Sequence, residues 1–513
     1  MAGSLNSEPR RTSELLIALL LLAVLSAAAV AWVAHRGYTL YYGDAEAHLN
    51  IARRVLDSRT PGLSQIGPMW LPLPHLLMLP LVWSDALWRT GLAGAIPAAF
   101  CFVAAGLLLF ATARRVYGDS AAAAATLAVF ALNANVLYLQ AIPMTEPVLA
   151  GTLAALLYST VRFRESQSLA WAAAAGVAGL ATSLARFEGW SLIPIVSLYF
   201  LFAAQRRRVL TAVVFGAIAS LGPLLWLAFC WWYSGDFLDF YRGPYSALAI
   251  YQRLLDSGME RYRGDHDWTQ ALLYYWNSVR LAAGWPALCL GIAGAVAAAF
   301  KRAWWPLLLL LAPPALIVGS IHSGGTPIYM PHMWPFSYWN TRFGVTALPA
   351  LAFAAGALVV LAPKRLRAPA CLLVAALAVV PWLLSPWPEN SICWKESQVN
   401  SEARRAWTHQ GAAFMREHYR HGTGILMYFS DLAAIPREAG IPLRETLHQD
   451  NLAAWSGAVS KPSIFLHEEW AVTMEGDPAE AAMVKTVREG PGYEILKTIA
   501  VEGQPAIHIY RRH

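Results

Sequence analysis

Asp44, Glu46 and His48 form the densest group of chemically capable side chains in the sequence, directly after the first apolar segment. On a helix, Asp44 and His48 share a face, whereas in an extended segment all three side chains project to one side. In either geometry Asp44 can accept a proton from a substrate hydroxyl group, and the three residues could also ligate a divalent cation. The alternative is a solvated helix start in which Asp44 complements the positive end of the helix.

A second acid, Glu146, is bracketed by Pro143 and Pro147 at the boundary of an apolar segment. A carboxylate is costly to keep there unless it has a partner or a chemical role, so we interpret Glu146 as a site residue. A Thr-Glu helix start ahead of proline is the alternative. Arg186 and Glu188 occur at a similar boundary, where a guanidinium could bind a phosphate with two hydrogen bonds. An Arg186–Glu188 ion pair that closes a tight turn explains the motif nearly as well.

Tyr338, Trp339 and Arg342 follow the irregular segment 324–327 and precede another apolar run. Arg342 is a second candidate for binding phosphate, and the two aromatic rings would form a wall beside it. Aromatic and basic residues also anchor helix ends among lipid headgroups, which is the better explanation for Trp339.

Long apolar segments must position these residues. The chain has 513 residues, of which 57% are hydrophobic and only 14% charged, against about a quarter charged in soluble domains. This composition excludes a soluble enzyme, a disordered chain and a coiled coil. Runs long enough to cross the bilayer predict a polytopic α-helical membrane protein with about eleven transmembrane helices. The expected spans lie near 14–34, 91–112, 119–138, 147–162, 169–185, 190–205, 209–232, 281–300, 304–321, 343–361 and 368–386.

Lysine and arginine residues cluster in every second short connection, which accounts for the net charge of +7 without nucleic acid as a partner. This bias is typical of cytoplasmic loops, so we expect a plasma (inner) membrane protein with a cytoplasmic N-terminus. Cleavage of the first segment as a signal peptide is the alternative. The basic connections contain Arg10, Arg11, Arg114, Arg115, Arg162, Arg164, Arg206, Arg207, Arg208, Lys301, Arg302, Lys364, Arg365 and Arg367.

The long polar segments then all lie on the extracytoplasmic face. We assign 35–90, as the first external loop, to a membrane domain 1–387, with the stretch from Trp70 to Trp83 re-entrant or interfacial. Residues 388–513 lack long apolar runs and are expected to form a separate extracytoplasmic α/β domain. Its pattern predicts a helix over 403–419 and strands over 424–429, 463–466 and 506–510, the last at an edge.

This constellation resembles the GT-C superfamily of membrane glycosyltransferases, and is most similar to its protein mannosyltransferase and aminoarabinose transferase branch. The resemblance covers about residues 10–390 as an architecture. Its specific matches are Gly43-Asp44-Ala45-Glu46, Met144-Thr145-Glu146-Pro147 and Arg342. The family motif has its two acids adjacent, whereas Ala45 separates them here.

The resemblance implies transfer of a sugar from a polyprenyl-phosphate donor to a glycan, lipid or protein acceptor on the extracytoplasmic face, with inversion. Asp44 would be the catalytic acid-base residue and Glu146 the second acid. Arg186 and Arg342 would bind the donor phosphate, and the apolar bundle with 70–83 the prenyl chain. Glu46, His48, Glu188 and Tyr338 complete the expected substrate site. Metal dependence varies within the family, so Asp44, Glu46 and His48 could hold a divalent cation.

Two other functions fit parts of the sequence. A secondary transporter would use Glu146, Arg186 and Glu188 as coupling residues at a site formed by broken helices. It would, however, place polar residues deep within the spans, and here they crowd the outer rim. A non-enzymatic cell-envelope assembly factor, with 388–513 as its partner-binding domain, is the third hypothesis.

Overall fold

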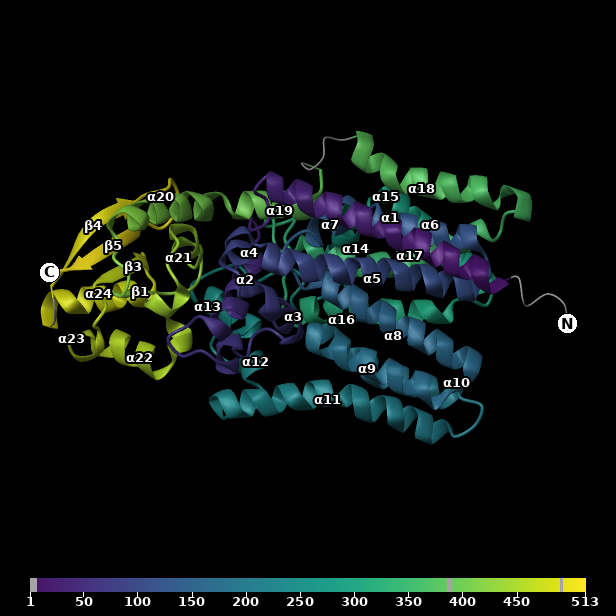
Figure 1. Ribbon diagram of the computed structural model, residues 1–513, viewed down its shortest axis with the longest axis horizontal. Coiled ribbons are helices and arrows are strands. Elements are labelled where there is room, and N and C mark those ends of the chain that lie inside the picture. The colour runs from purple at the N-terminus through teal and green to yellow at the C-terminus, as the bar shows by residue number, and fades with distance from the viewer. Residues whose placement is uncertain (1–6, 385–389, 490–491) are drawn as a thin grey trace. The chain divides into compact units, whose positions relative to one another are not determined.

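The computed structural model describes residues 7–384, 390–489 and 492–513. Two compact units share the chain, and both are interrupted in sequence (Figure 1). Unit 1 comprises Met1–Arg36, Pro68–Pro74 and Ala95–Glu396. Unit 2 comprises Gly37–Gly67, His75–Gly94 and Ser397–His513.

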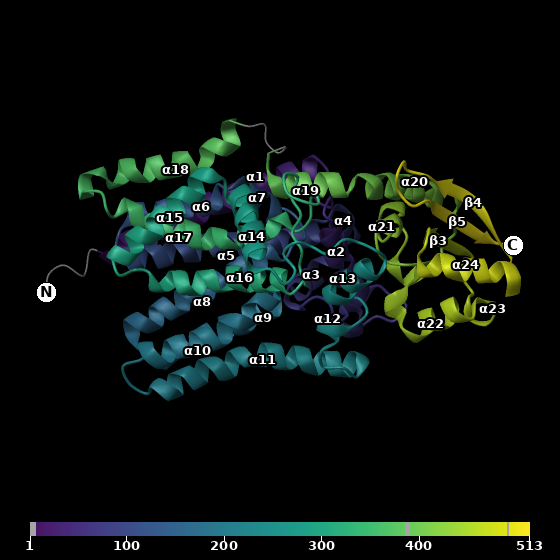
Figure 2. The same ribbon diagram turned by 180° about the vertical axis from the view of Figure 1, so that it is seen from behind.

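Unit 1 is a bundle of helices. Its layers are built by direct packing: α9 lies between α8 and α11, and α17 lies between α6 and α15 (Figures 1 and 2). Side chains define several helix starts, since Asp119 and Ser168 accept hydrogen bonds from the first free amides of α6 and α9. The helices are α1 (Ser7–His35), α5 (Leu92–Tyr117), α6 (Ser120–Ala131), α7 (Ala134–Leu139), α8 (Glu146–Ser166), α9 (Leu169–Ala185), α10 (Leu192–Ala203), α11 (Arg208–Ser234), α12 (Asp239–Arg242), α13 (Ala247–Asp256), α14 (Trp268–Ala283), α15 (Trp285–Phe300), α16 (Trp305–His322), α17 (Leu348–Val359) and α18 (Arg367–Leu384).

The apolar helices confirm a multi-pass membrane protein. Among the described residues, six helical segments are long and apolar enough to cross a bilayer. The pair α14 and α15, bent by 111° at Gly284, would make a seventh if it counts as one span. Each expected span contains a helix, but several are short, and 119–138 is divided into α6 and α7. The count of eleven spans is therefore not confirmed.

Unit 2 contains a five-stranded mixed sheet in the order β2-β1-β3-β5-β4. β1 pairs in parallel with β2 and β3, whereas β3, β5 and β4 are antiparallel neighbours. The strands are β1 (Ile425–Met427), β2 (Thr446–Leu447), β3 (Trp470–Met474), β4 (Tyr493–Ile499) and β5 (Ile507–Arg512). The helices after α19 (Ile392–Asn400) are α20 (Glu402–His418), α21 (Ala434–Ala439), α22 (Ala453–Ser460), α23 (Pro462–Phe465) and α24 (Pro478–Glu489).

Alternation along β1 creates the two cores of this α/β sheet. Ile425 and Met427 pack with α20 residues on one face, and Leu426 packs with Trp455 and Met483 on the other. The predicted α/β class, the helix 403–419 and two of the three strands are confirmed. The predicted strand 463–466 is wrong because Pro462 starts the short helix α23 there. β5 is also not an edge strand, since β4 covers it.

The segment 35–90, which the sequence predicts to be the first external loop, folds mostly within unit 2. Its helices are α2 (Gly43–Leu56), α3 (Leu73–Val82) and α4 (Asp85–Thr90). Leu49 of α2, Met78 of α3 and Trp88 of α4 share one core with Leu443 from the C-terminal segment. The apolar side of α2 is thus buried in protein.

Ion pairs reinforce this association. Asp57 binds Arg53 at 3.0 Å and accepts a hydrogen bond from the amide of Leu443, while Arg54 pairs with Asp450. Residues 35–90, assigned to the membrane domain by sequence, therefore group mostly with the C-terminal segment. The expected boundary at 387/388 lies outside the described residues, and the division into a catalytic membrane domain and a separate C-terminal domain stays a prediction.

Candidate functional site

Unit 1 contains a continuous row of buried ionic groups. The charged row consists, in order, of Glu188, Arg186, Glu146, Arg342 and Glu396. Arg186 lies 2.7 Å from Glu188 Oε1 and 3.0 Å from Glu146 Oε1. Arg342 lies 3.1 Å from the same oxygen of Glu146 and 3.3 Å from Glu396 Oε1. Each guanidinium thus bridges two carboxylates, and Glu146 is shared by both.

Glu146 is positioned by the start of α8. Pro147 occupies the first turn, where a missing amide hydrogen costs nothing and the fixed backbone angle suits a helix. The carboxylate lies at the positive end of the helix, which stabilises its charge. Thr145, directly before the helix, accepts a hydrogen bond from Arg186 Nη1 at 2.8 Å.

Arg186 and Glu188 lie in the tight turn after α9. Arg186 is extended and is followed by the 3₁₀ turn Phe187–Ser191. Gly189 permits this turn, because a Cβ atom there would lie 2.4 Å from the carbonyl oxygen of Thr182. Arg186 and Glu188 pair as the sequence alternative proposed, and Arg186 also reaches Glu146.

Arg342 lies on the 3₁₀ segment Thr341–Ala347 that leads into α17. Two contacts hold this segment against α14: Ser278 donates to the carbonyl of Thr341 at 2.8 Å, and Gly344 approaches the Ser278 carbonyl too closely for any side chain. The guanidinium carbons of Arg342 and Arg186 lie 5.2 and 5.0 Å from the ring centroid of Phe343. Both cations therefore contact one aromatic ring.

Glu396 completes the charged row and was missed by the sequence analysis. It receives hydrogen bonds from the amides of Asn340 and Thr341 at 3.0 and 2.8 Å, and from the Thr341 hydroxyl. Burial raises the pKa of the Glu396 carboxyl group, while Arg342 and Thr341 oppose that rise. The sequence around Glu396 contains no motif that would reveal this role, because its partners lie about 55 positions earlier in the chain.

The charge of the row is unbalanced. It contains three carboxylates and two guanidiniums. Apart from Glu146, each arginine also forms an ion pair with one end of the row, Arg186 with Glu188 and Arg342 with Glu396. Glu146 Oε1 accepts from both arginines, whereas its buried Oε2 atom has no hydrogen-bond partner among the described residues. A buried oxygen without a partner is costly in a structural ion pair, and it is available to a ligand.

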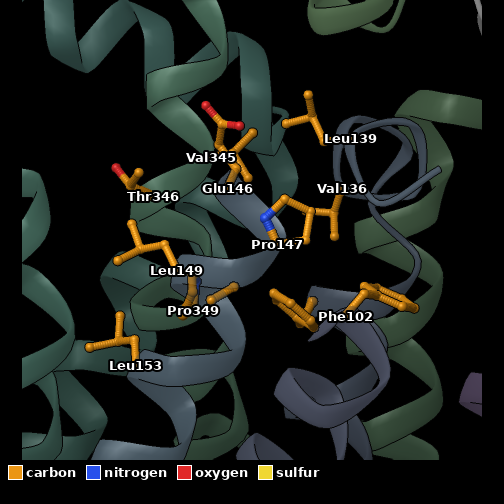
Figure 3. Close-up of a pocket in the computed structure, with 12 residues that line it drawn as sticks. Phe102, Val136, Leu139, Glu146, Pro147, Leu149, Leu153, Val345, Thr346 and Pro349 are labelled. Atoms are coloured by element: carbon orange, nitrogen blue, oxygen red, sulfur yellow. The ribbon is translucent and has the colours of Figure 1, made fainter. Parts of the chain in front are cut away.

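An apolar pocket adjoins this carboxylate. Figure 3 shows Glu146 at one end of the pocket, with Phe102, Pro147 and Leu149 around the remainder. The pocket has a volume of about 30 Å³, so it is a narrow slot. The slot therefore places apolar side chains directly beside the carboxylate that the two arginines share.

The other acidic motif belongs to unit 2. Glu46 is buried and forms a two-pronged ion pair with Arg437, at 2.8 Å to Oε1 and 2.9 Å to Oε2. Asn50 donates to Glu46 Oε1 at 3.0 Å. His48 Nδ1 lies 2.9 Å from Nε2 of the buried His75. Sequence reasoning missed Arg437 and His75, because only the tertiary fold brings them to α2.

Asp44 lies half-buried in the first turn of α2. Tyr338 lies half-buried beside Trp339, which pairs with Tyr329 in an isolated bridge.

The structure brings together four predicted residues in unit 1, namely Glu146, Arg186, Glu188 and Arg342. It places Asp44, Glu46 and His48 together on α2 of unit 2. The functional roles expected for all of them stay predictions.

The α2 residues do not fit a metal site as they are arranged. Both oxygens of Glu46 are bound by Arg437, and Nδ1 of His48 is directed at His75. Across the described residues, no three histidine, cysteine, aspartate or glutamate side chains converge as a metal site would require. We therefore derive no chemical step through a metal ion.

The fold of the chain is similar to that of two solved proteins, which agrees with the fold that the sequence resemblance implied. ArnT from Cupriavidus metallidurans, solved with bound undecaprenyl phosphate, superposes with a TM-score of 0.53 at 13% identity over 96% of this chain and 97% of its own. The oligosaccharyltransferase of Archaeoglobus fulgidus, solved with Zn and sulfate, gives 0.53 at 15% identity over 96% of this chain and 72% of its own. No family model and no curated protein matches the sequence.

Proposed function

We propose that this protein is an integral membrane glycosyltransferase that moves a sugar from a polyprenyl-phosphate donor to an acceptor outside the cytoplasm. The observation that carries the proposal is the charged row at the end of an apolar slot, where Glu146 holds both arginines through Oε1 while its Oε2 atom has no hydrogen-bond partner among the described residues. The likeness in fold to ArnT, which was solved with undecaprenyl phosphate, supports the same donor class.

Arg186 and Arg342 would bind the donor phosphate. Each guanidinium already contacts carboxylate oxygens with the geometry that phosphate oxygens would need. An incoming phosphate would take over some of these contacts, and the positive charge would stabilise the phosphate as it leaves. Glu146 would hold the two guanidiniums at a common position, and Glu188 and Glu396 would each hold one from the outer side.

The acceptor oxygen or nitrogen would attack the anomeric carbon from the face opposite the phosphate. The new bond forms as the bond from carbon to phosphate oxygen breaks, so the anomeric configuration inverts. Asp44 would accept the proton that the acceptor loses, because a carboxylate is an available base at neutral pH. The polyprenyl phosphate then leaves with the electron pair of the broken bond.

A transfer assay on the purified full-length protein tests the proposal. The wild type and Asp44→Asn would be incubated with a panel of polyprenyl-phosphate sugars and candidate acceptors, with and without a chelator. We expect the wild type to consume one donor and the variant to lose at least about a hundredfold in rate, the usual size of a lost general base.

Asp431→Asn is the matched control, since it makes the same acid-to-amide change at an exposed residue of unit 2. An Asp44→Asn protein that is folded and fully active would overturn the role of Asp44. If the folded wild type consumed no donor with any acceptor, and instead moved a solute across sealed vesicles, the transporter hypothesis would replace this one.

A further inference from the structure

A basic hollow lies where the ends of α5, α8, α15 and α16 meet in unit 1. Its volume is about 240 Å³, far above the roughly 10–15 Å³ that admits one water molecule. The charged side chains that line the basic hollow are Arg115, Arg164, Glu165, Lys301 and Arg302. Four cations thus surround a space that contains one carboxylate.

That carboxylate is already bound. Glu165 Oε2 accepts a hydrogen bond from Arg115 at 2.7 Å and lies 3.5 Å from Arg162 Nε. For Arg164, Lys301 and Arg302, the described part of the chain provides no carboxylate within ion-pair distance. Three cations close together without a counter-charge create a positive potential that attracts an anion.

Aromatic rings give the basic hollow a fixed wall. The guanidinium carbon of Arg164 lies 5.0 Å from the ring centroid of Trp305, and Tyr199 stacks on the same indole with centroids 5.0 Å apart. Trp305 is buried, so the wall cannot turn away into solvent. Arg164 is thereby held beside this ring at the wall of the basic hollow.

The basic hollow is separate from the charged row. Glu146 is the first residue of α8 and Glu165 lies in its last turn, so the two sites are roughly 30 Å apart along the helix. They therefore lie at opposite ends of α8. Beside the hollow, Phe300 and Trp304 expose 81% and 49% of their surface, and exposed rings next to cations are typical of the headgroup level of a bilayer.

We propose that the basic hollow binds the phosphate headgroup of an anionic membrane phospholipid. Arg164, Lys301 and Arg302 would bind the phosphate oxygens, and Phe300 and Trp304 would contact the glycerol and upper acyl chain. Inorganic phosphate offers the same anion without an apolar part. The exposed rings at the mouth favour the lipid, because only a lipid would cover them.

Native mass spectrometry of the full-length protein tests this proposal, with phosphatidylglycerol, phosphatidylcholine and inorganic phosphate as separate probes. The test variant is Lys301→Gln with Arg302→Gln. The matched control is Arg206→Gln with Arg207→Gln, two exposed basic residues of another short connection outside the hollow. The pairs are comparable in backbone strain, because Arg302 and Arg207 both have left-handed backbone angles, with φ of 54° and 52°.

We expect the wild type and the control to retain phosphatidylglycerol over phosphatidylcholine, and the test variant to bind phosphatidylglycerol about tenfold more weakly. The same lipid should raise the melting temperature of the wild type and the control but not that of the test variant. Equal losses in both pairs would overturn the proposal in favour of general surface charge. Retention of inorganic phosphate by the wild type without any preference for phosphatidylglycerol over phosphatidylcholine would also overturn it.

Discussion

Glu46 and Glu146 are both buried glutamates paired with arginine, yet their surroundings differ. Glu46 meets Arg437 with both oxygens, and Asn50 adds a third donor, so every contact of the carboxylate is closed within unit 2. Glu146 uses one oxygen for Arg186 and Arg342, and its other oxygen, beside an apolar slot, has no partner in the part of the chain that the structure describes. One arrangement is complete without a ligand, whereas the other has an open position.

This difference separates stability from function in the two units. Removing the charge of Glu46 would leave Arg437 buried without a carboxylate. Removing the charge of Glu146 would leave each arginine with its own carboxylate, Glu188 or Glu396. The same substitution should therefore affect folding in unit 2 and chemistry in unit 1.

Glu46→Gln should produce the largest loss of stability, about 3–5 kcal/mol, because an uncompensated buried charge is expensive. Thermal unfolding of the purified protein in detergent measures the effect. The pair Arg511–Glu469, whose side chains are 45% and 29% exposed, supplies the control Glu469→Gln, which should cost about 1 kcal/mol or less. An equal loss in both variants would remove the structural role that we infer for Glu46.

Glu146→Gln should lower the transfer rate by about 10²–10³-fold, as loss of one electrostatic group in a preorganised site does. The melting temperature should change little, since the amide oxygen can still accept from both arginines. Rate and unfolding measured on the same preparation test both halves of the expectation. If Glu146→Gln lowered the melting temperature but left the transfer rate unchanged, Glu146 would have the same structural role as Glu46.

The stability of unit 2 should decline on acidification, because burial lowers the pKa of His448 from 6.5 to about 4. Above pH 6.5 the imidazole is neutral in both states. Between pH 6.5 and 4 only the unfolded chain binds the proton, so stability falls by about 3 kcal/mol over this window. Melting temperatures measured across it should slope less steeply in His448→Gln, and an unchanged slope would exclude His448 as the cause.

Arg342→Lys should have the smallest effect, raising the apparent donor KM by about tenfold with a smaller change in kcat. Lysine keeps the charge but cannot bridge two oxygens as the planar guanidinium does. Initial rates over a range of donor concentrations separate the two constants. If the apparent KM for the donor did not change, we would instead interpret Arg342 as a residue that anchors a helix end at the membrane boundary.

The sequence was sufficient for features that depend on local patterns. Run length and low charge determined a helical membrane protein, and the change of composition near residue 390 determined a C-terminal α/β segment. Glu146 and Arg186 could be recognised as candidate site residues because a charge at a membrane boundary is costly unless it has a partner or a function. The number of spans could not be counted in this way, since breaks such as the 111° bend at Gly284 do not alter hydropathy.

Only the tertiary structure decided which charges meet. Glu396 joins Arg342 across 54 positions, and Arg437 joins Glu46 across 391. No local pattern encodes such pairs, because the cost of burying each charge is offset only when distant segments pack together. The sequence thus determined that ionic groups would lie at the edge of the apolar bundle, and the packing of the chain decided which of them are closed ion pairs and which is open to a ligand.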